Sequence, residues 1–273
     1  MDIRLIALDL DGTLLDDDHV TVPRRNVDAL RAAHDRGVKI ALASGRSWSL
    51  LAGAVEQLGC VDYGLCANGA LVLEGATGRV LHSHAMPNAQ ALAIIGILQA
   101  EGIPFEVYCQ GKNYVRLADK VQVRHNNPPA YVDFFEQVTT YPADLAQALA
   151  GREVEKFNCF AVPPAKRVAV EAAVRATGPV EVANSFGVNL EFSLGGVTKG
   201  EGLRALCAHL GLAPEQVMAF GDAGNDLEML DFAGWSFAMA NGSDEAKAHA
   251  RYLAPANTEA GVGQMVEKYV LGS

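Results

Sequence analysis

The chain has 273 residues, half of them hydrophobic, and can therefore bury a substantial core in one large domain or two modest ones. It carries 22 Lys and Arg residues against 32 Asp and Glu residues, and the resulting charge of −10 argues against a nucleic-acid or anionic-membrane surface as a partner. No apolar run reaches the roughly 18 residues of a membrane span and no signal-peptide pattern is present, so we expect a cytoplasmic protein.

The first third of the chain predicts alternating strands and helices. The apolar run 3–8 indicates a buried strand, 21–37 has a capping Thr, a first-turn Pro and helical spacing, and 38–43 indicates a second buried strand. A helix over 50–58 and a short strand over 63–67 follow. Because strand, helix, strand, helix, strand is the order that produces a parallel sheet, the expected fold class is α/β.

The pattern changes near residue 68 and indicates an inserted α+β domain. A hairpin over 71–81 precedes an apolar helix over 88–100. Further strands are expected at 105–109, 113–117, 155–162 and 180–183, with helices near 143–150 and 165–176. The segment Arg124 to Ala130, which contains two Asn and two Pro residues in a row, has the composition of a surface loop.

The first pattern resumes near residue 188. A strand containing Leu190 and Phe192 is expected there, followed by a helix from Lys199. A buried strand over 217–220 comes next, and a final helix over 262–271 is predicted to pack on the core. These elements define two predicted domains, a discontinuous core of residues 1–83 and 187–273 and an inserted domain of residues 84–186.

Two carboxylates, Asp9 and Asp11, lie two residues apart where the first strand gives way to a loop. In an open α/β sheet ligands bind beyond the carboxyl ends of the strands, so this position favours a function over a contribution to stability. Gly12 gives the backbone the freedom to turn both carboxylates toward one cavity. One of the pair could be a nucleophile and the other a proton donor, an arrangement suited to phosphate chemistry.

Four polar loops at predicted strand ends or helix starts are expected to form one site. They are Asp9–Thr13, Ser44–Arg46, Thr198–Gly200 and Gly221–Asp226. The Ser44 hydroxyl and the Lys199 ammonium can each contact phosphoryl oxygens, and amide N–H groups at the starts of the following helices add positive potential. An acidic chain needs such a local positive site to bind an anionic substrate.

The last of these loops adds Asp222 and Asp226 to the vicinity of Asp9. Carboxylates at this density would repel one another without a cation. Mg²⁺ fits best, because it prefers octahedral oxygen coordination, keeps several waters and binds through few carboxylates together with substrate phosphate. We therefore expect Mg²⁺ as the cofactor, with Asp9 and Asp222 as side-chain ligands.

Together the motifs resemble the four ordered motifs of the haloacid dehalogenase (HAD) superfamily of phosphatases. The matching residues are Asp9-Leu10-Asp11-Gly12-Thr13, Ser44-Gly45-Arg46, Lys199-Gly200 and Gly221-Asp222-Ala223-Gly224-Asn225-Asp226. The segment between the second and third motifs is similar to the C2B cap of the Cof-type branch, which hydrolyses mainly small phosphorylated metabolites. The resemblance implies a Rossmann-like parallel-sheet core under a mobile, inserted α+β cap.

The same resemblance implies roles for individual residues. Asp9 would be the nucleophile that forms an aspartyl-phosphate, and Asp11 the acid that protonates the leaving oxygen and then activates water, while its backbone carbonyl binds Mg²⁺. The presence of Asp11 favours phosphoester hydrolysis or phosphomutase action over dehalogenation. The complete assignment is phosphate binding by Ser44, Gly45, Lys199 and Asn225, metal binding by Asp9, Asp11 and Asp222, and support of these residues by Asp226, Arg46 and Asn68.

Taken singly, several of these residues have ordinary structural explanations. Lys199 alone would be a solvated surface lysine, and Asn225 or Asp226 alone could cap the following helix. Arg46 can equally contact substrate or form a structural ion pair, and Asn68 can orient substrate or form the turn before the hairpin. The order of the four motifs along the chain outweighs these separate explanations.

The leading hypothesis is a Mg²⁺-dependent phosphatase of small cytoplasmic metabolites, with sugar phosphates favoured and pyridoxal phosphate, flavin mononucleotide and phosphoglycolate as further candidates. A phosphomutase of phosphosugars is the first alternative, and it requires a cap that retains a doubly phosphorylated intermediate. A noncatalytic phosphometabolite sensor is the second. The intact set of Asp9, Asp11, Lys199 and Asp222 argues against the sensor, because a pure binder has no use for a nucleophile and an acid together.

Overall fold

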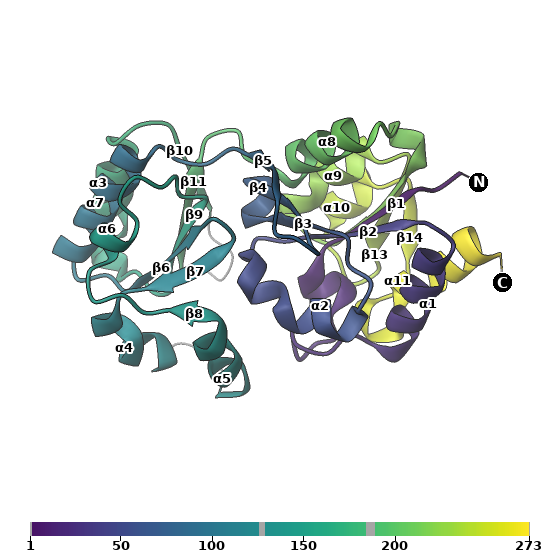
Figure 1. The fold of residues 1–273 in the computed structure, drawn as a ribbon, viewed down its shortest axis with the longest axis horizontal. Coiled ribbons are helices and arrows are strands. Elements are labelled where there is room, and N and C mark those ends of the chain that lie inside the picture. The colour runs from purple at the N-terminus through teal and green to yellow at the C-terminus, as the bar shows by residue number, and fades with distance from the viewer. Residues whose placement is uncertain (1, 126–128, 184–188, 273) are drawn as a thin grey trace. The chain divides into compact units, whose positions relative to one another are not determined.

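The computed structural model describes residues 2–125, 129–183 and 189–272, which form two units (Figure 1). The core unit is drawn from the segments Met1–Arg46, Leu51–His82 and Thr198–Ser273. The inserted unit is drawn from Ser47–Leu50 and Ser83–Val197. Among the described residues, no helix has both the length and the apolar character that crossing a membrane requires.

A mostly parallel sheet forms the core unit. Its described strands are β1 (Leu5–Leu8), β2 (Lys39–Ala43), β3 (Tyr63–Cys66), β4 (Leu71–Glu74), β5 (Val80–Ser83), β12 (Val217–Gly221), β13 (Trp235–Met239) and β14 (Tyr252–Ala254). They lie in the order β14-β13-β12-β1-β2-β3-β4-β5, parallel from β14 to β3, with β4 antiparallel to β3. Strands β1 and β12 are buried along their whole length, as expected for a sheet with helices on both faces.

Helices cover both faces of the core sheet. They are α1 (Arg24–Asp35), α2 (Ala52–Leu58), α8 (Lys199–Leu210), α9 (Leu227–Phe232), α10 (Asp244–His249) and α11 (Gly261–Val266). Figure 1 shows α8, α9 and α10 on one face and α1, α2 and α11 on the other. Leu203 and Leu206 of α8 share a buried cluster with Leu5 and Ala7 of β1, so the alternation of side chains along β1 serves both layers.

The strand order reverses at β1, and this reversal fixes where a ligand can bind. The chain runs from β1 to β2 and β3 on one side and later returns to β12 on the other. Leu8 is level with Phe220, so the residues that follow β1 and β12 lie next to each other at the carboxyl edge. Open α/β sheets bind their ligands at such a switch point, and the first and fourth predicted motifs lie there.

A second sheet forms the inserted unit. Its described strands are β6 (Phe105–Cys109), β7 (Lys112–Val115), β8 (Thr139–Thr140), β9 (Lys156–Cys159), β10 (Val180–Ala183) and β11 (Leu190–Leu194). They lie in the order β10-β11-β9-β6-β7-β8, antiparallel except for β7 and β8. The helices of this unit are α3 (Asn88–Ala100), α4 (Lys120–His125), α5 (Pro129–Val138), α6 (Leu145–Ala148) and α7 (Pro164–Arg175).

The two faces of this second sheet differ in chemistry. Phe105 and Val107 of β6 join the apolar cluster to which α3 and α7 contribute. Glu106 and Tyr108, which alternate with them, belong to the other face, where the Tyr108 hydroxyl donates to Oε1 of Glu106 over 2.8 Å. Asn158 of β9 donates to the same oxygen over 2.8 Å. One face therefore supplies the hydrophobic core of the unit and the other carries a polar network.

The strand at Leu190–Leu194 lies in the inserted unit, which corrects the sequence-based assignment of this strand to the core. It pairs antiparallel with β9 and β10, and the buried Leu190 and Phe192 join the apolar cluster of that unit. An alternating apolar strand fits either sheet equally well, so its pattern alone could not choose between them. The chain returns to the core unit at Thr198 and not at residue 187.

The short segment Ser47–Leu50 also groups with the inserted unit, although it lies within the predicted core. The backbone N–H of Ser49 donates to the carbonyl of Gly111 over 2.9 Å. The Oγ of Ser49 in turn accepts the backbone N–H of Asn113 over 3.2 Å. These two bonds fasten the segment to the hairpin between β6 and β7. The chain thus passes from one unit to the other directly after Arg46.

The expected loop Arg124 to Ala130 is largely helical where it is described. Arg124 and His125 end α4, and Pro129 begins α5, whereas residues 126–128 lie outside the described residues. A proline tolerates the first position of a helix because the N–H that it lacks would have no partner there, so Pro129 starts a helix and does not mark a loop. The other predicted strands and helices are confirmed within a few residues.

Candidate active site

The loop after β1 carries Asp9 and is fastened to β12. The backbone N–H of Asp9 donates to the carbonyl of Phe220 over 3.1 Å, which keeps the residue at the edge of the sheet. Gly12 adopts a φ of +78°, and a Cβ there would lie 2.5 Å from Oδ2 of Asp222. The loop thus requires glycine both for its backbone conformation and for the close approach of Asp222.

Lys199 is fully buried between two carboxylates. Its ammonium donates to Oδ1 of Asp9 over 2.5 Å and to Oδ1 of Asp226 over 2.7 Å. The residue begins α8, whose N-cap Thr198 accepts the backbone N–H of Glu201. Burial alone would lower the pKa of Lys199, but Asp226 and Asp9 raise it above its usual range, so the ammonium stays charged.

Asp226 shapes the loop after β12. Its Oδ2 accepts the backbone N–H groups of Asp222 and Ala223 at 2.9 and 3.1 Å, while its Oδ1 binds Lys199. Gly221 is required at the start of this loop, because a Cβ there would lie 2.5 Å from Cβ of Asp226. Asp226 therefore holds the loop that presents Asp222 and orients the buried lysine at the same time.

Asp9, Asp222 and Asp226 bring carboxylate oxygens within 4.8 Å of one another. Burial raises the pKa of Asp9 well above its usual range, Lys199 opposes this rise, and the carboxylates of Asp226 and Asp222 add to it. Burial and the charge of Asp226 also raise the pKa of Asp222, against a hydrogen bond of 3.1 Å from Thr13. Lys199 alone does not balance three carboxylates. This set of hard oxygen donors fits a divalent cation such as Mg²⁺.

Ser44 directly follows β2 and is buried. Its Oγ accepts the backbone N–H of Arg46 over 3.2 Å, and as a hydroxyl it can still donate to a phosphoryl oxygen. The carbonyl of Ser44 accepts the backbone N–H of Asn68 over 2.9 Å. The Oδ1 of Asn68 accepts from the amide of Asn225 over 3.1 Å. The structure therefore joins the second motif to the fourth through Asn68.

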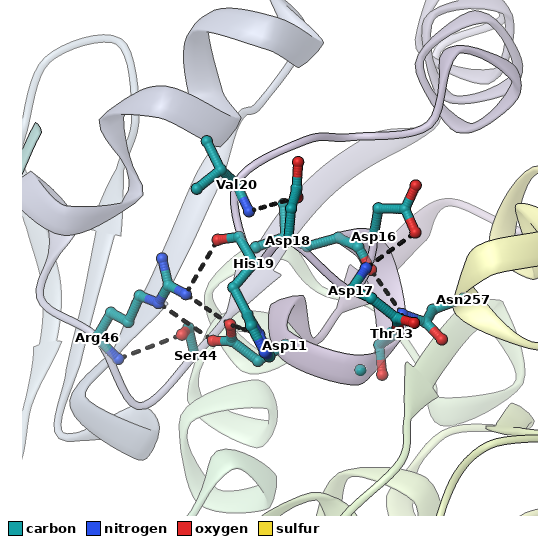
Figure 2. Close-up of polar contacts among 12 residues, drawn as sticks. Asp11, Thr13, Asp16, Asp17, Asp18, His19, Val20, Ser44, Arg46 and Asn257 are labelled. Atoms are coloured by element: carbon teal, nitrogen blue, oxygen red, sulfur yellow. Dashed lines mark hydrogen bonds and ion pairs between the residues drawn. The ribbon is translucent and has the colours of Figure 1, made fainter. Parts of the chain in front are cut away.

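Asp11 has different partners from the buried carboxylates (Figure 2). Arg46 donates from Nη2 to Oδ1 over 2.5 Å and from Nε to Oδ2 over 3.1 Å, and Nδ1 of His19 lies 3.1 Å from Oδ1. Gly45 is the single residue between Arg46 and Ser44. The sequence left open whether Arg46 contacts substrate or forms an ion pair, and the structure shows the ion pair.

Two asparagines that the sequence analysis missed fasten the loop that carries Asp9 and Asp11. Asn241 donates to the carbonyl of Gly12 over 2.7 Å and accepts the backbone N–H of Asn257 over 3.0 Å. Asn257 donates to the carbonyl of Leu15 over 3.0 Å. It also donates to Asp17 over 3.2 Å (Figure 2). The only available signal was the position of Asn241 just beyond the carboxyl end of β13.

The chain belongs to the family of haloacid dehalogenase-like hydrolases, whose family model matches residues 6–266. The match begins within β1 and ends with α11, so it includes the core segments on both sides of the insertion. The resemblance inferred from the four motifs is confirmed, and the chain is a hydrolase of this family.

Proteins similar to the chain over nearly its whole length include named phosphatases. The 5-amino-6-(5-phospho-D-ribitylamino)uracil phosphatase YcsE of Bacillus subtilis is 26% identical over 277 residues, which cover 99% of this chain and 97% of that protein. The pyridoxal phosphate phosphatase YbhA of Escherichia coli is 28% identical over 284 residues, which cover 99% and 100%. The solved structure of the HAD subclass IIB sugar phosphatase BT4131 has a TM-score of 0.78 at 24% identity, covering 97% of this chain and 98% of that one. The last likeness confirms the fold, an α/β core with an insertion.

Proposed function

We propose that this protein is a Mg²⁺-dependent phosphatase that hydrolyses small phosphorylated metabolites through a phosphoenzyme at Asp9. The observation that carries the proposal is the buried cluster in which Lys199 binds Asp9 and Asp226 close to Asp222. Mg²⁺, held by Asp9, Asp222 and the backbone carbonyl of Asp11, would keep the carboxylates ionised and neutralise charge on the phosphoryl group.

The proposed reaction has two steps. An oxygen of Asp9 would attack phosphorus while the bond to the ester oxygen breaks, with Ser44 and Lys199 holding the phosphoryl oxygens and Asp11 giving its proton to the leaving oxygen. Asp11 would then take a proton from water as the water oxygen attacks the phosphorus. The bond between Asp9 and phosphorus breaks in this second step, inorganic phosphate leaves, and both carboxyl groups return to their starting states.

Small phosphate monoesters are the substrates that the named relatives support. YcsE is named for a phosphoribityl compound and YbhA for pyridoxal phosphate, and in each the phosphate is attached to one small molecule. A ribityl phosphate is a polyol phosphate, close in chemistry to a sugar phosphate. We therefore propose sugar and polyol phosphates as the first substrates to test, with pyridoxal phosphate next.

The deciding experiment measures phosphate release from sugar phosphates, nucleotides, pyridoxal phosphate and flavin mononucleotide, with Mg²⁺ and with EDTA. We expect turnover that requires the metal and is lost in Asp9→Asn, which removes the nucleophile with almost no change in volume. Arg25→Gln, which removes an exposed ion pair with Glu267, is the matched control. No release from a folded, Mg²⁺-binding protein would overturn the proposal, and transfer of label between positions of one sugar would identify a mutase.

A further inference from the structure

Both carboxylate oxygens of Asp11 accept hydrogen bonds from a neighbouring side chain (Figure 2). Arg46 contacts Oδ1 through Nη2 and Oδ2 through Nε, a forked geometry in which two N–H groups meet the two oxygens of one carboxylate. His19 approaches Oδ1 through Nδ1. A hydrogen on Nδ1 would make this contact a hydrogen bond from His19 to the carboxyl group. The backbone carbonyl of His19 accepts from Arg46 over 3.5 Å, which links the two residues that hold Asp11.

These contacts conflict with the role of Asp11 as the general acid of the proposed function. A general acid must carry a proton on one carboxyl oxygen and direct it at the leaving oxygen of the ester. Both oxygens of Asp11 are instead occupied by N–H groups of Arg46. Arg–carboxylate forks are among the stronger side-chain hydrogen bonds, so Asp11 must leave the fork and take up a proton from solvent water before it can donate one.

We propose that Arg46 and His19 form a latch: they hold Asp11 in an orientation that cannot protonate the leaving group, and they release it when a phosphate ester binds. The proposal rests on the proposed phosphatase function. Arg46 is a positioning residue in it, because it acts through Asp11. The backbone N–H of Arg46 already contacts Oγ of Ser44, the expected phosphate-binding hydroxyl. A phosphate dianion at Ser44 would therefore compete with Asp11 for the guanidinium, and the charge on the substrate would supply the energy of opening.

The latch lies at a point where the chain leaves the core unit. Arg46 is the last residue before Ser47–Leu50, the segment that belongs to the inserted unit. Ser49 in this segment is bonded to Gly111 and Asn113 of the β6–β7 hairpin. The residue that holds Asp11 is therefore directly continuous in sequence with the inserted unit.

The kinetic test compares two esters in single turnover with enzyme in excess. An alkyl phosphate needs a proton on its leaving oxygen, whereas p-nitrophenyl phosphate does not. Loss of the guanidinium also removes a contact to the phosphate group, which the two esters share, so the informative quantity is the ratio of the two rates. We expect Arg46→Gln to raise the rate of phosphoryl transfer from the alkyl ester relative to that from the aryl ester about threefold or more. A fall in this ratio would overturn the latch, because Arg46 would then hold Asp11 in its productive position.

His19→Asn is the matched second variant. Asn suits the φ of +58° at this position better than most residues, so the loop should keep its conformation. We expect a smaller rise for the alkyl ester than in Arg46→Gln, because His19 contacts one oxygen of Asp11 and Arg46 contacts both. Arg25→Gln removes another fork, to Glu267, and should change neither ester.

A structure of the wild-type protein with Mg²⁺ and orthovanadate tests the latch without any variant. We expect the fork to be broken, with Nη2 of Arg46 more than about 4 Å from Oδ1 of Asp11. An intact fork beside bound vanadate would overturn the proposal. The failure of the latch and of the phosphatase are distinguishable: if wild type cleaves neither ester the function fails, and if it cleaves both without the expected rise only the latch fails.

Discussion

Each unit of this protein buries a lysine against acidic side chains, and the two arrangements differ in charge and position. In the inserted unit Nζ of Lys156 lies 2.6 Å from Oε2 of Glu191, on the polar face of the sheet. In the core unit Lys199 meets both Asp9 and Asp226 beyond the ends of strands. The first is a cross-strand pair inside regular structure, whereas the second lies in the loops after β1 and β12 and at the start of α8.

The difference explains why the cluster around Lys199 suits catalysis, whereas the pair of Lys156 and Glu191 suits a structural role in the sheet. Lys156 and Glu191 carry opposite charges within a larger polar network that includes Glu106, whose pKa burial raises. This network therefore has little surplus charge to attract a ligand, and its main effect is on how the strands fit together. Three carboxylates near Lys199 leave a surplus of negative charge that a divalent cation can balance. Loops at a switch point also leave room for a substrate, which the middle of a sheet does not.

The largest expected effect is the loss of the nucleophile. Asp9→Asn should lower turnover by about 10³-fold or more, because the amide cannot form the acyl phosphate. Thermal unfolding should show a folded protein, since the side-chain volume is nearly unchanged. Activity that survives in a preparation free of other phosphatases would exclude Asp9 as the nucleophile.

Removing each lysine in turn sharpens the comparison between the units. Lys199→Met and Lys156→Met should each lower the free energy of unfolding by about 3 kcal/mol, because each strands a buried carboxylate. Only Lys199→Met should also lower turnover of p-nitrophenyl phosphate, by about 10²-fold or more, while Lys156→Met should stay within about threefold. Urea unfolding and phosphate release measure the two effects. Equal losses of activity would remove the distinction between the clusters.

Asp11→Asn should give a loss that depends on the leaving group. We expect turnover of an alkyl phosphate to fall by about 10²-fold or more, and turnover of p-nitrophenyl phosphate to fall much less, because nitrophenolate leaves without a proton. Steady-state rates for a series of esters with increasing leaving-group pKa would measure this dependence. The same loss for every ester would argue against the acid role.

The smallest expected effect on turnover concerns a buried acid in the inserted unit, whose titration should change stability alone. Glu155 accepts the backbone N–H of Gln110 in the β6–β7 turn over 2.7 Å, and burial raises its pKa from 4.5 to about 7 against the hydrogen bonds that it accepts. Between pH 4.5 and about pH 7, Glu155 keeps its proton in the folded protein but has lost it in the unfolded chain. The free energy of unfolding therefore falls as the pH rises through this range and then levels off.

Glu155→Gln removes this titration and should flatten the pH dependence. The wild-type protein should lose up to about 3 kcal/mol of unfolding free energy more than the variant between about pH 4.5 and pH 7. Urea unfolding at several pH values, with Arg25→Gln as a control for general effects of charge, would detect it. Parallel curves for wild type and Glu155→Gln would show that Glu155 titrates alike in both states.

The sequence predicted where the site lies more completely than it predicted the contacts between the residues of the site. The positions of Asp9 and Asp222 followed from the rule that parallel strands bring their carboxyl ends together, and the structure places them at one edge. The partners of Asp11 could not be predicted in this way. His19 reaches Asp11 through a loop conformation with positive φ, and Asn241 acts on a backbone carbonyl, so neither contact leaves a pattern along the chain.

The wrong elements have the same kind of cause. The strand around Leu190 and Phe192 alternates correctly but carries no information about which of two sheets it joins. Pro129 was counted as part of a surface loop, although proline is also favoured at the first position of a helix. Local patterns therefore identified most elements, while the choice of partner strand depended on residues distant in sequence.

The pairing of β1 with β12 has a consequence for how the nascent chain folds. Leu5 of β1 pairs with Val217 of β12. The centre of the core sheet therefore cannot form until the ribosome has added more than two hundred residues after the first strand. The inserted unit takes most of its residues from one continuous stretch, 83–197, and can fold while β1 to β3 still lack their neighbour. On the ribosome the middle of this protein should mature before its beginning, and the apolar first strand is the part that most needs protection from aggregation during synthesis.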